Sequence, residues 1–297
     1  MLYRCYAKIN LTLEILGKRD DGYHDLASLV HTVSLADDLR IEPADELLSR
    51  VEGLDIDPET NLAARAAELL AGHTGQRRGA ELSLVKRIPA AAGLGGGSSD
   101  AATTLVGLNA LWDTGLGLAD LAQLAAELGS DVPFFVRGGA AVMRGRGENL
   151  EPVPALVGQW LVVVVPAHDV LDKTRRLYAS LDRSDFSSGE LTDAAADLLR
   201  RRDKLGATHL VNGFERAART VFAGLSAAWA EAERRCHRRF FLSGAGPALF
   251  AFANDRFDAR RQQASLERIG LPAHAVRTVK HARVSLKVAA ETAIGYP

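Results

Sequence analysis

Apolar and polar residues alternate in the first part of the chain. Between positions 7 and 15, every second residue is apolar, namely Ala7, Ile9, Leu11, Leu13 and Ile15. This period of two predicts a β-strand with one buried face, because neighbouring side chains of a strand point to opposite sides. Lys8 and Asn10 then project together from the other face of the strand.

Later segments show either helical spacing or further alternation. These periodicities predict helices at 62–70, 98–112, 119–128, 193–202 and 212–235, and strands at 29–41, 82–88, 160–165, 240–242, 249–252 and 284–288. The first helix starts after Thr60-Asn61 and Gly129 caps the third, while the Asp37-Asp38 pair is interpreted as a turn. Because strands and helices are mixed without a regular βα repeat, the sequence predicts an α+β fold.

A loop at 151–158 that contains two prolines predicts a domain boundary. We expect one domain of residues 1–155 and a second of residues 156–297.

The most informative segment is a glycine-rich loop between a predicted strand and a predicted helix. It consists of Pro89, Ala90, Ala91, Ala92, Gly93, Leu94, Gly95, Gly96, Gly97, Ser98 and Ser99. The glycines permit backbone conformations that other residues resist, so several N–H groups can converge on one anion. Ser98 and Ser99 are favourable N-cap residues, and the helix after them directs its positive dipole end to the same point. The loop is neither a Walker A motif nor a dinucleotide fingerprint, and we interpret it as a phosphate-binding loop rather than a flexible connector.

Composition narrows the class of protein further. Of the 297 residues, 47% are hydrophobic and 25% are charged, which is typical of a well-cored globular protein. The formal net charge of -1 gives no general attraction to nucleic acid or to anionic membranes. Arginine runs at 200–202 and 234–239 are interpreted as solvated helix faces. The two cysteines cannot form a disulfide framework, so we expect a cytoplasmic protein.

Several motifs together resemble the GHMP kinases, the superfamily of galactokinase, homoserine kinase and mevalonate kinase. The matching segments are the glycine loop, 7–13, 17–25 and 128–135, with looser matches at 212–215 and 243–247. The extended glycine loop is most similar to the branch that phosphorylates a cytidyl sugar-alcohol diphosphate, although Ala90, Ala91 and Ala92 replace glycines often found there. The resemblance spans nearly the whole chain. It implies a two-domain GHMP-kinase-like fold with an N-terminal nucleotide-binding, catalytic domain and a C-terminal substrate domain.

The resemblance implies Lys8 and Asp131 as the catalytic residues. Asp131 would orient the acceptor hydroxyl group and accept its proton, and Lys8 would stabilise the negative charge that develops during transfer from ATP. Taken alone, Asp131 is also consistent with a helix cap, and Lys8 with a solvated lysine on a strand.

The resemblance also implies residues on the substrate side. Tyr23 and His24 are expected to hold the cytidine, Asn10 to contact the sugar alcohol or its phosphates, and Thr174 to line the site. Taken alone, His24 is equally consistent with a loop residue that has no special role.

The implied ligands are ATP and a small-molecule substrate, with Mg²⁺ accompanying the nucleotide. The sequence has no cluster of residues with metal-ligand spacing, so the phosphates and water are expected to hold the magnesium, with Ser99 as the candidate protein ligand. We expect neither nucleic acid nor membrane as a partner, and a monomer or weak homodimer. Two alternatives stay open: a GHMP kinase for a different alcohol, and a nucleotide-binding protein without activity.

Overall fold

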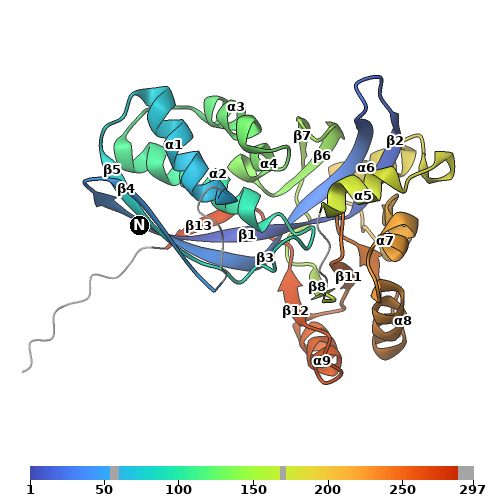
Figure 1. Ribbon diagram of the computed structural model, residues 1–297. Coiled ribbons are helices and arrows are strands. Elements are labelled where there is room, and N and C mark those ends of the chain that lie inside the picture. Colours follow the sequence, from blue (N-terminus) through green and yellow to red (C-terminus); the bar gives the residue numbers. More distant parts are fainter. Residues whose placement is uncertain (54–59, 168–171, 287–297) are drawn as a thin grey trace, which may run out of the picture.

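Two β-sheets and the helices that cover them make up the fold, as a computed structural model shows (Figure 1). The structure describes residues 1–53, 60–167 and 172–286. The larger sheet has the strand order β13-β1-β3-β2-β9, with β5, β4, β6 and β7 attached through β3. The smaller sheet has the order β10-β11-β8-β12. The α+β prediction is confirmed.

The strands are β1 (Leu2–Asn10), β2 (Thr12–Lys18), β3 (His24–Ala44), β4 (Leu47–Glu52), β5 (Gly79–Val85), β6 (Ala140–Gly145), β7 (Asn149–Val153), β8 (Trp160–Val164), β9 (Val211–Asn212), β10 (Phe241–Leu242), β11 (Leu249–Phe252), β12 (Ala273–Arg277) and β13 (Arg283–Leu286). The α-helices are α1 (Leu62–Thr74), α2 (Gly96–Trp112), α3 (Leu118–Leu128), α4 (Val132–Arg137), α5 (Lys173–Ala179), α6 (Glu190–Arg201), α7 (Glu215–Val221), α8 (Leu225–Cys236) and α9 (Arg256–Glu267).

The long strand β3 organises the larger sheet, because it pairs with β1, β2, β5 and β6 along its length. It passes through Asp37 and Asp38 without a turn, so that prediction was wrong. The Asp37 carboxylate is fully buried and accepts hydrogen bonds from the backbone N–H groups of Arg87 and Ile88 at 2.5 and 2.7 Å. A carboxylate satisfied by long-range donors cannot be distinguished from a turn residue by local pattern alone.

The alternating N-terminal segment forms two strands rather than one, with a break at Leu11. Both of its faces are buried, which corrects the prediction of a single buried face. On the polar side, Glu14 accepts hydrogen bonds from the N–H groups of Gly189 and Thr192, at the N-terminus of α6. The positive end of the helix dipole stabilises this buried carboxylate. Polar residues of the strand are therefore buried against helix termini and loops of the later half.

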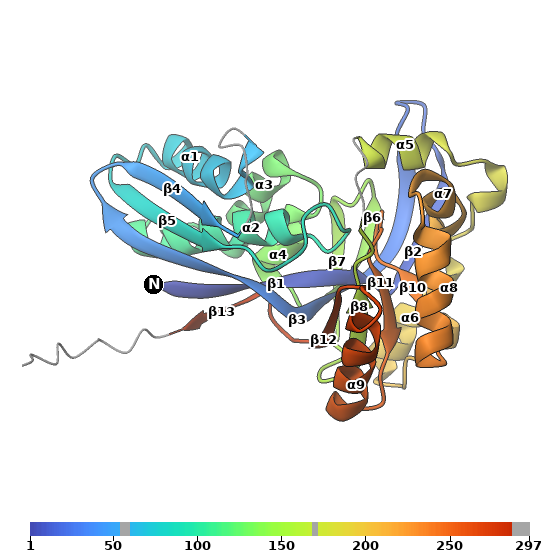
Figure 2. The ribbon, with the colours of Figure 1, turned by 60° about the horizontal axis from the view of Figure 1, so that its bottom comes forward.

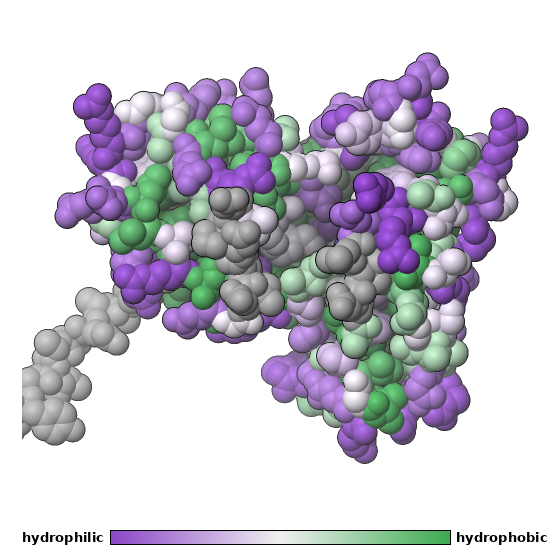
Figure 3. Space-filling model, in the orientation of Figure 1, coloured by the Kyte–Doolittle hydropathy of each residue, from purple (hydrophilic) through white to green (hydrophobic). Residues whose placement is uncertain are grey.

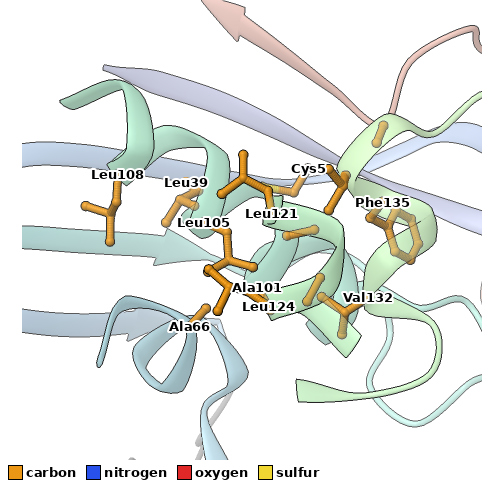
Figure 4. Close-up of a cluster of buried hydrophobic side chains, with 14 of the residues drawn as sticks. Cys5, Leu39, Ala66, Ala101, Leu105, Leu108, Leu121, Leu124, Val132 and Phe135 are labelled. Carbon is orange, nitrogen blue, oxygen red and sulfur yellow. The ribbon is translucent and has the colours of Figure 1, made fainter. Parts of the chain in front are cut away.

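Helices α1 to α4 cover one face of the larger sheet and enclose the first hydrophobic core (Figure 1). Figure 4 shows part of this core, in which apolar side chains of α2 lie among residues of the neighbouring helices and strands; the labelled residues are Cys5, Leu39, Ala66, Ala101, Leu105, Leu108, Leu121, Leu124, Val132 and Phe135. The helices at 62–74, 96–112 and 118–128 were predicted with ends within a few residues of those observed. Asn61 caps α1 by accepting from the N–H of Ala63 at 3.0 Å.

A second core lies between the two sheets and a third beneath α7, α8 and α9. The strand β8 contributes to both, because Leu161 and Val163 face the second core and Val162 and Val164 the third. Figure 2 shows α8 and α9 on the outer side of the smaller sheet, away from α1 to α4. The short apolar run predicted as a buried strand is thus buried on both faces.

The observed elements differ from the predicted ones in three ways. The helix predicted over 212–235 is divided into α7 and α8, because Gly224 adopts a φ of 78° between them. Strands β4, β6, β7, β9 and β12 and helix α5 were not predicted. The strand predicted at 284–288 is observed as β13 up to Leu286, while Val288 lies outside the described residues.

The later half of the chain also contributes to the larger sheet. Strand β9 pairs in parallel with β2, and β13 pairs antiparallel with β1. The boundary between 155 and 156 stays a prediction. None of the helices within the described ranges has the length and apolar character that a membrane crossing requires.

The turn after α4 provides a test of how tightly these segments pack. Gly138 has a φ of 70°, and a Cβ atom there would lie 2.2 Å from the backbone nitrogen of Ala282. Gly138→Ala should lower the free energy of unfolding by about 3 kcal/mol or more, because left-handed strain and overpacking add. Chemical denaturation measures the change.

Gly75→Ala is the matched control, since Gly75 has a φ of 64° but open space around it. This substitution should lower the free energy of unfolding by only about 1 kcal/mol, because it adds backbone strain without overpacking. Equal losses for both variants would show that the contact with Ala282 does not constrain the fold.

Candidate active site

Lys8 and Asp131 meet although they are far apart in the sequence. The Lys8 Nζ atom lies 3.3 Å from Asp131 Oδ2. The Lys8 side chain is buried, whereas the Asp131 side chain is 36% exposed. Asp131 occupies the N-cap position of α4, yet its side chain makes no capping hydrogen bond. The carboxylate is therefore turned toward the lysine instead of toward the helix.

Asn10 lies beside Lys8 on the same face of the strand, as predicted. Its Oδ1 accepts a hydrogen bond from Lys8 Nζ at 2.7 Å, and its Nδ2 donates to Ser28 Oγ at 2.8 Å. Ser28 in turn donates to the carbonyl of Thr12 at 2.6 Å. This chain of hydrogen bonds fixes the direction of the Lys8 ammonium group. A contact between Asn10 and the substrate stays a prediction.

The glycine loop rests directly on the strand that carries Lys8. The backbone N–H of Lys8 donates to the carbonyl of Leu94 at 2.9 Å. Helix α2 begins immediately after its N-cap residue Gly95, which adopts a left-handed φ of 70°. Ser98 and Ser99 lie inside the helix, so their predicted N-cap role was wrong. The first turn of a helix leaves N–H groups without intrahelical partners, and the first turn of α2 directly follows the loop, as expected of a phosphate site.

A buried cluster of three charged side chains lies at the two ends of the glycine loop. Lys86 Nζ donates to Asp37 Oδ2 at 2.5 Å and to Asp100 Oδ2 at 2.6 Å. Burial opposes the charge of Lys86, but the two carboxylates outweigh it and raise the pKa of that ammonium group. Burial raises the pKa of Asp100 to about 7, against the lowering effect of Lys86. The cluster connects β3, the end of β5 and the first turns of α2.

The late glycine turn, residues 243–247, covers the glycine loop. Ala248 donates its N–H to the carbonyl of Ala92 at 3.0 Å, and Ser243 Oγ donates to the carbonyl of Gly93 at 3.2 Å. A Cβ atom on Gly244 would lie 3.3 Å from Lys8 Nζ. Asn212 holds the turn by donating to the carbonyls of Leu242 and Gly244, both at 2.9 Å. The two looser motifs of the sequence thus form one structural unit.

One cavity lies along the glycine loop. Its volume is about 290 Å³, and its lining is formed by the start of α1, Lys86, Asp100 and most of the loop residues. Leu94 and Ser99 are buried and do not line it. Ser99 Oγ has no hydrogen-bond partner among the described atoms. The cavity combines backbone N–H groups, a helix N-terminus and hydroxyl groups, the chemistry that binds phosphates.

A second cavity of about 1060 Å³ is lined by three of the four residues predicted for the substrate side, whereas Asn10 is not part of its lining. Tyr23, His24 and Thr174 line it together with Tyr178 and Arg146. Figure 3 shows the surface hollowed between the part formed by α1 to α4 and the part that carries α5, with hydrophilic side chains along both borders. The sequence therefore placed three residues from two separate segments around one cavity.

Aromatic contacts shape the second cavity. The His24 ring stacks on Tyr178 with 4.9 Å between centroids, and the Arg146 guanidinium lies 4.3 Å above the Tyr23 ring. Burial, followed by the charge of Lys18, lowers the pKa of His24, so its ring is neutral near pH 7. Burial, followed by the charge of Asp131, raises the pKa of Tyr178 to about 12. Neutral aromatic groups of this kind suit the flat face of a base.

Sequence reasoning missed three residues of this cavity: Arg146, Lys173 and Tyr178. Tyr178 follows Thr174 at helical spacing, which is the one signal that indicates its orientation into the same space. Arg146 and Lys173 carry no such signal, because their contacts are with residues distant in sequence.

The Lys8–Asp131 pair lies between the two cavities. Gly95, which lines the first, would place a Cβ atom 3.0 Å from Lys8 Cγ. Ser130, which lines the second, directly precedes Asp131. The pair therefore adjoins residues of both cavities.

Comparison with known proteins agrees with the motifs. Residues 61–139 match the model of the GHMP kinases N terminal domain. The chain is 42% identical over 275 residues to a 4-diphosphocytidyl-2-C-methyl-D-erythritol kinase of Dehalococcoides mccartyi, covering 92% of this chain and 96% of that protein. A crystal structure of 4-(cytidine 5'-diphospho)-2C-methyl-D-erythritol kinase has a TM-score of 0.80 at 36% identity, covering 94% of this chain and 99% of the other. A homoserine kinase of Cytophaga hutchinsonii, 18% identical with a TM-score of 0.71 over 96% of each chain, shares the fold.

Crowding of the glycine loop should weaken the binding of ATP, the donor that the motifs imply. A Cβ atom on Gly95 would lie 2.9 Å from ring carbons of Phe135. Gly95→Val should raise the Kd of a non-hydrolysable ATP analogue about 10- to 100-fold, since displaced N–H groups lose charge-assisted hydrogen bonds. Calorimetric titration measures the Kd.

Gly115→Val serves as the control, because Gly115 has a similar φ of 73° in open space and lines neither cavity. It should leave the Kd unchanged. An unchanged Kd for Gly95→Val as well would place the nucleotide elsewhere.

Proposed function

The chain belongs to the 4-diphosphocytidyl-2-C-methyl-D-erythritol kinase family of the GHMP kinases, and we propose that it uses ATP to phosphorylate the 2-hydroxyl group of 4-diphosphocytidyl-2-C-methyl-D-erythritol. The products are the 2-phosphate and ADP. The reaction belongs to the non-mevalonate route to isoprenoid precursors. The observation that carries this proposal is the Lys8–Asp131 pair between a phosphate-binding cavity and an aromatic one.

The first cavity is the proposed donor site. Backbone N–H groups of the glycine loop and the start of α2 bind the phosphates of ATP, with the terminal phosphoryl group directed toward Lys8. The short distance between Gly95 and Lys8 supports this direction. Hydrogen bonds to charged phosphate oxygens contribute roughly 1.5–3 kcal/mol each, so a few of them hold a nucleotide.

Magnesium is the proposed companion of ATP. The described residues contain no group of three or more His, Cys, Asp or Glu side chains that could hold a metal. Ser99, the candidate protein ligand, is buried and does not line the cavity along the glycine loop, so the ligands proposed for the ion are phosphate oxygens and water. When bound, the ion neutralises phosphate charge during the transfer.

The second cavity is the proposed acceptor site. We assign the cytidine to Tyr23 and His24, with Tyr178 and Thr174 on the side formed by α5, because stacked neutral rings provide a face for a base. Arg146 supplies positive charge for the diphosphate. The acceptor hydroxyl group then lies near Asp131.

In the transfer step, Asp131 orients the acceptor hydroxyl group toward phosphorus. It accepts the proton late, as the new P–O bond forms, because the transition state is loose and the nucleophile needs little prior activation. Lys8 stabilises the negative charge on the transferring group and, through Asn10, keeps a fixed direction. A small-molecule substrate and ATP are the proposed partners. A cytoplasmic location and a monomeric or weakly dimeric state stay predictions.

The first experiment is turnover with magnesium-ATP against diphosphocytidyl-methylerythritol, mevalonate, homoserine and galactose. The proposal expects phosphorylation of the cytidyl substrate alone. ADP release and the mass of the product measure this turnover. Turnover of another alcohol would change the assigned substrate. ATP binding without turnover of any of them would favour a nucleotide-binding protein without activity.

Removal of the proposed base is a sharper test. Asp131→Ala should lower kcat about 100-fold or more, the contribution typical of general-base catalysis, while the Kd of the ATP analogue changes little. Asp197→Ala is the control, because Asp197 is exposed on α6 and pairs only with Arg200 among the ion pairs of the described residues. Near-normal kcat in Asp131→Ala would remove this residue from the mechanism.

A further inference from the structure

Lys173, the first residue of α5, connects two loops of the site. Its Nζ donates hydrogen bonds to the carbonyl of Ala91 in the glycine loop and to the carbonyl of Gly246 in the late glycine turn, the second at 2.6 Å. The side chain is half-buried. A lysine that binds two carbonyl groups of separate loops is held in one position, at a cost in side-chain entropy that a purely solvated lysine avoids.

These two hydrogen bonds of Lys173 lie at the junction between the two cavities. Ala91 is the residue that the two linings have in common among the described residues, and Lys173 itself lines the larger cavity. The two loops also bond to each other through Ala248 and Ala92. Lys173 thus lies where a phosphoryl group would pass from the donor to the acceptor.

The backbone conformation of Ala91 gives a reason for the hydrogen bond from Lys173. Its φ is 51°, in the left-handed region that glycine adopts freely and alanine resists. Such a conformation persists only when its surroundings enforce it. The hydrogen bond from Lys173 to the Ala91 carbonyl is a contact that holds this conformation, at the position where the sequence has alanine in place of the glycine often found.

The charges around Lys173 suit a phosphoryl group. Burial, followed by the charge of Lys8, lowers its pKa to about 8, and the charge of Asp131 opposes this shift. On its own helix, Arg175 is paired with Asp172 at 2.8 Å. Two ammonium groups and one carboxylate therefore share the junction. An incoming phosphoryl group, with its charged oxygens, would be attracted to the second ammonium group as well as to the first.

We propose that Lys173 is a positioning residue for phosphoryl transfer: it holds the donor loop to the late glycine turn and places a second positive charge at the junction of the two cavities. This inference rests on the proposed function. It has two separable parts, one that acts through the loop and one that acts through charge.

Lys173→Met tests both parts together. It should lower kcat about 100-fold, as expected for the loss of one group that stabilises the transition state, and raise the Kd of a non-hydrolysable ATP analogue about tenfold, through the loosened loop. Lys204→Met is the control, because Lys204 is exposed and lines neither cavity. A Lys173→Met variant with the kcat and Kd of the wild type would overturn the proposal.

The two parts are separated by a second substitution. Adding Ala91→Gly to Lys173→Met should restore the affinity for the ATP analogue, because glycine adopts the left-handed conformation unaided. It should not restore kcat, because the charge is still absent. Full recovery of kcat would contradict the proposed role of the Lys173 charge in the transfer. An affinity that stays low would contradict the proposed role of Lys173 in holding the glycine loop.

Lys173→Arg supplies a readout that a merely structural contact would not change. In the wild type, kcat/KM should fall as the pH rises through about 8, because it reports the free enzyme and Lys173 loses its proton there. Arginine stays charged, so this decline should be absent in the variant, and an unchanged decline would contradict the inference. Absence of wild-type turnover would count against the proposed function, and the Kd measurements would still decide the role of Lys173 in the loop.

Discussion

The buried ammonium group of Lys8 is the constraint on which the remainder of the site depends. A charge removed from water is costly unless polar or charged partners replace its hydration. Here the partners come from two places in the chain, Asn10 on the same strand and Asp131 at the start of α4. Any arrangement that satisfies Lys8 through these groups must therefore bring the larger sheet and a helix N-terminus together. That convergence also creates the boundary between the two cavities.

A second buried lysine has a different task. Lys86 is enclosed by Asp37 and Asp100, and these groups fix the strand that enters the glycine loop and the helix that leaves it. Lys8 keeps one partially exposed carboxylate beside it, whereas Lys86 is paired with two buried ones. The first arrangement leaves a carboxylate accessible to a ligand. The second fixes the backbone on which the ligand would bind.

The sequence predicted those parts of the fold and the site that depend on the pattern of neighbouring residues. Helical spacing placed α1, α2 and α3, and four glycines before an amphipathic helix indicated the phosphate loop. Asp37 was misinterpreted because its donors, at Arg87 and Ile88, are about fifty positions away along the chain. The division between α7 and α8 depends on one glycine within an otherwise continuous helical pattern. Lys173 escaped notice for the same reason as Asp37, since both of its carbonyl partners belong to other segments.

The pairing of β1 with β13 connects the strand of Lys8 to one of the last described strands. Contacts between segments this distant in sequence close very large loops, and proteins dominated by such contacts fold slowly. The late glycine turn, which covers the phosphate loop, leaves the ribosome long after that loop. During synthesis the phosphate loop therefore remains uncovered while residues 100–242 emerge. The strand of Lys8 acquires its neighbour on one side only when β13 has emerged.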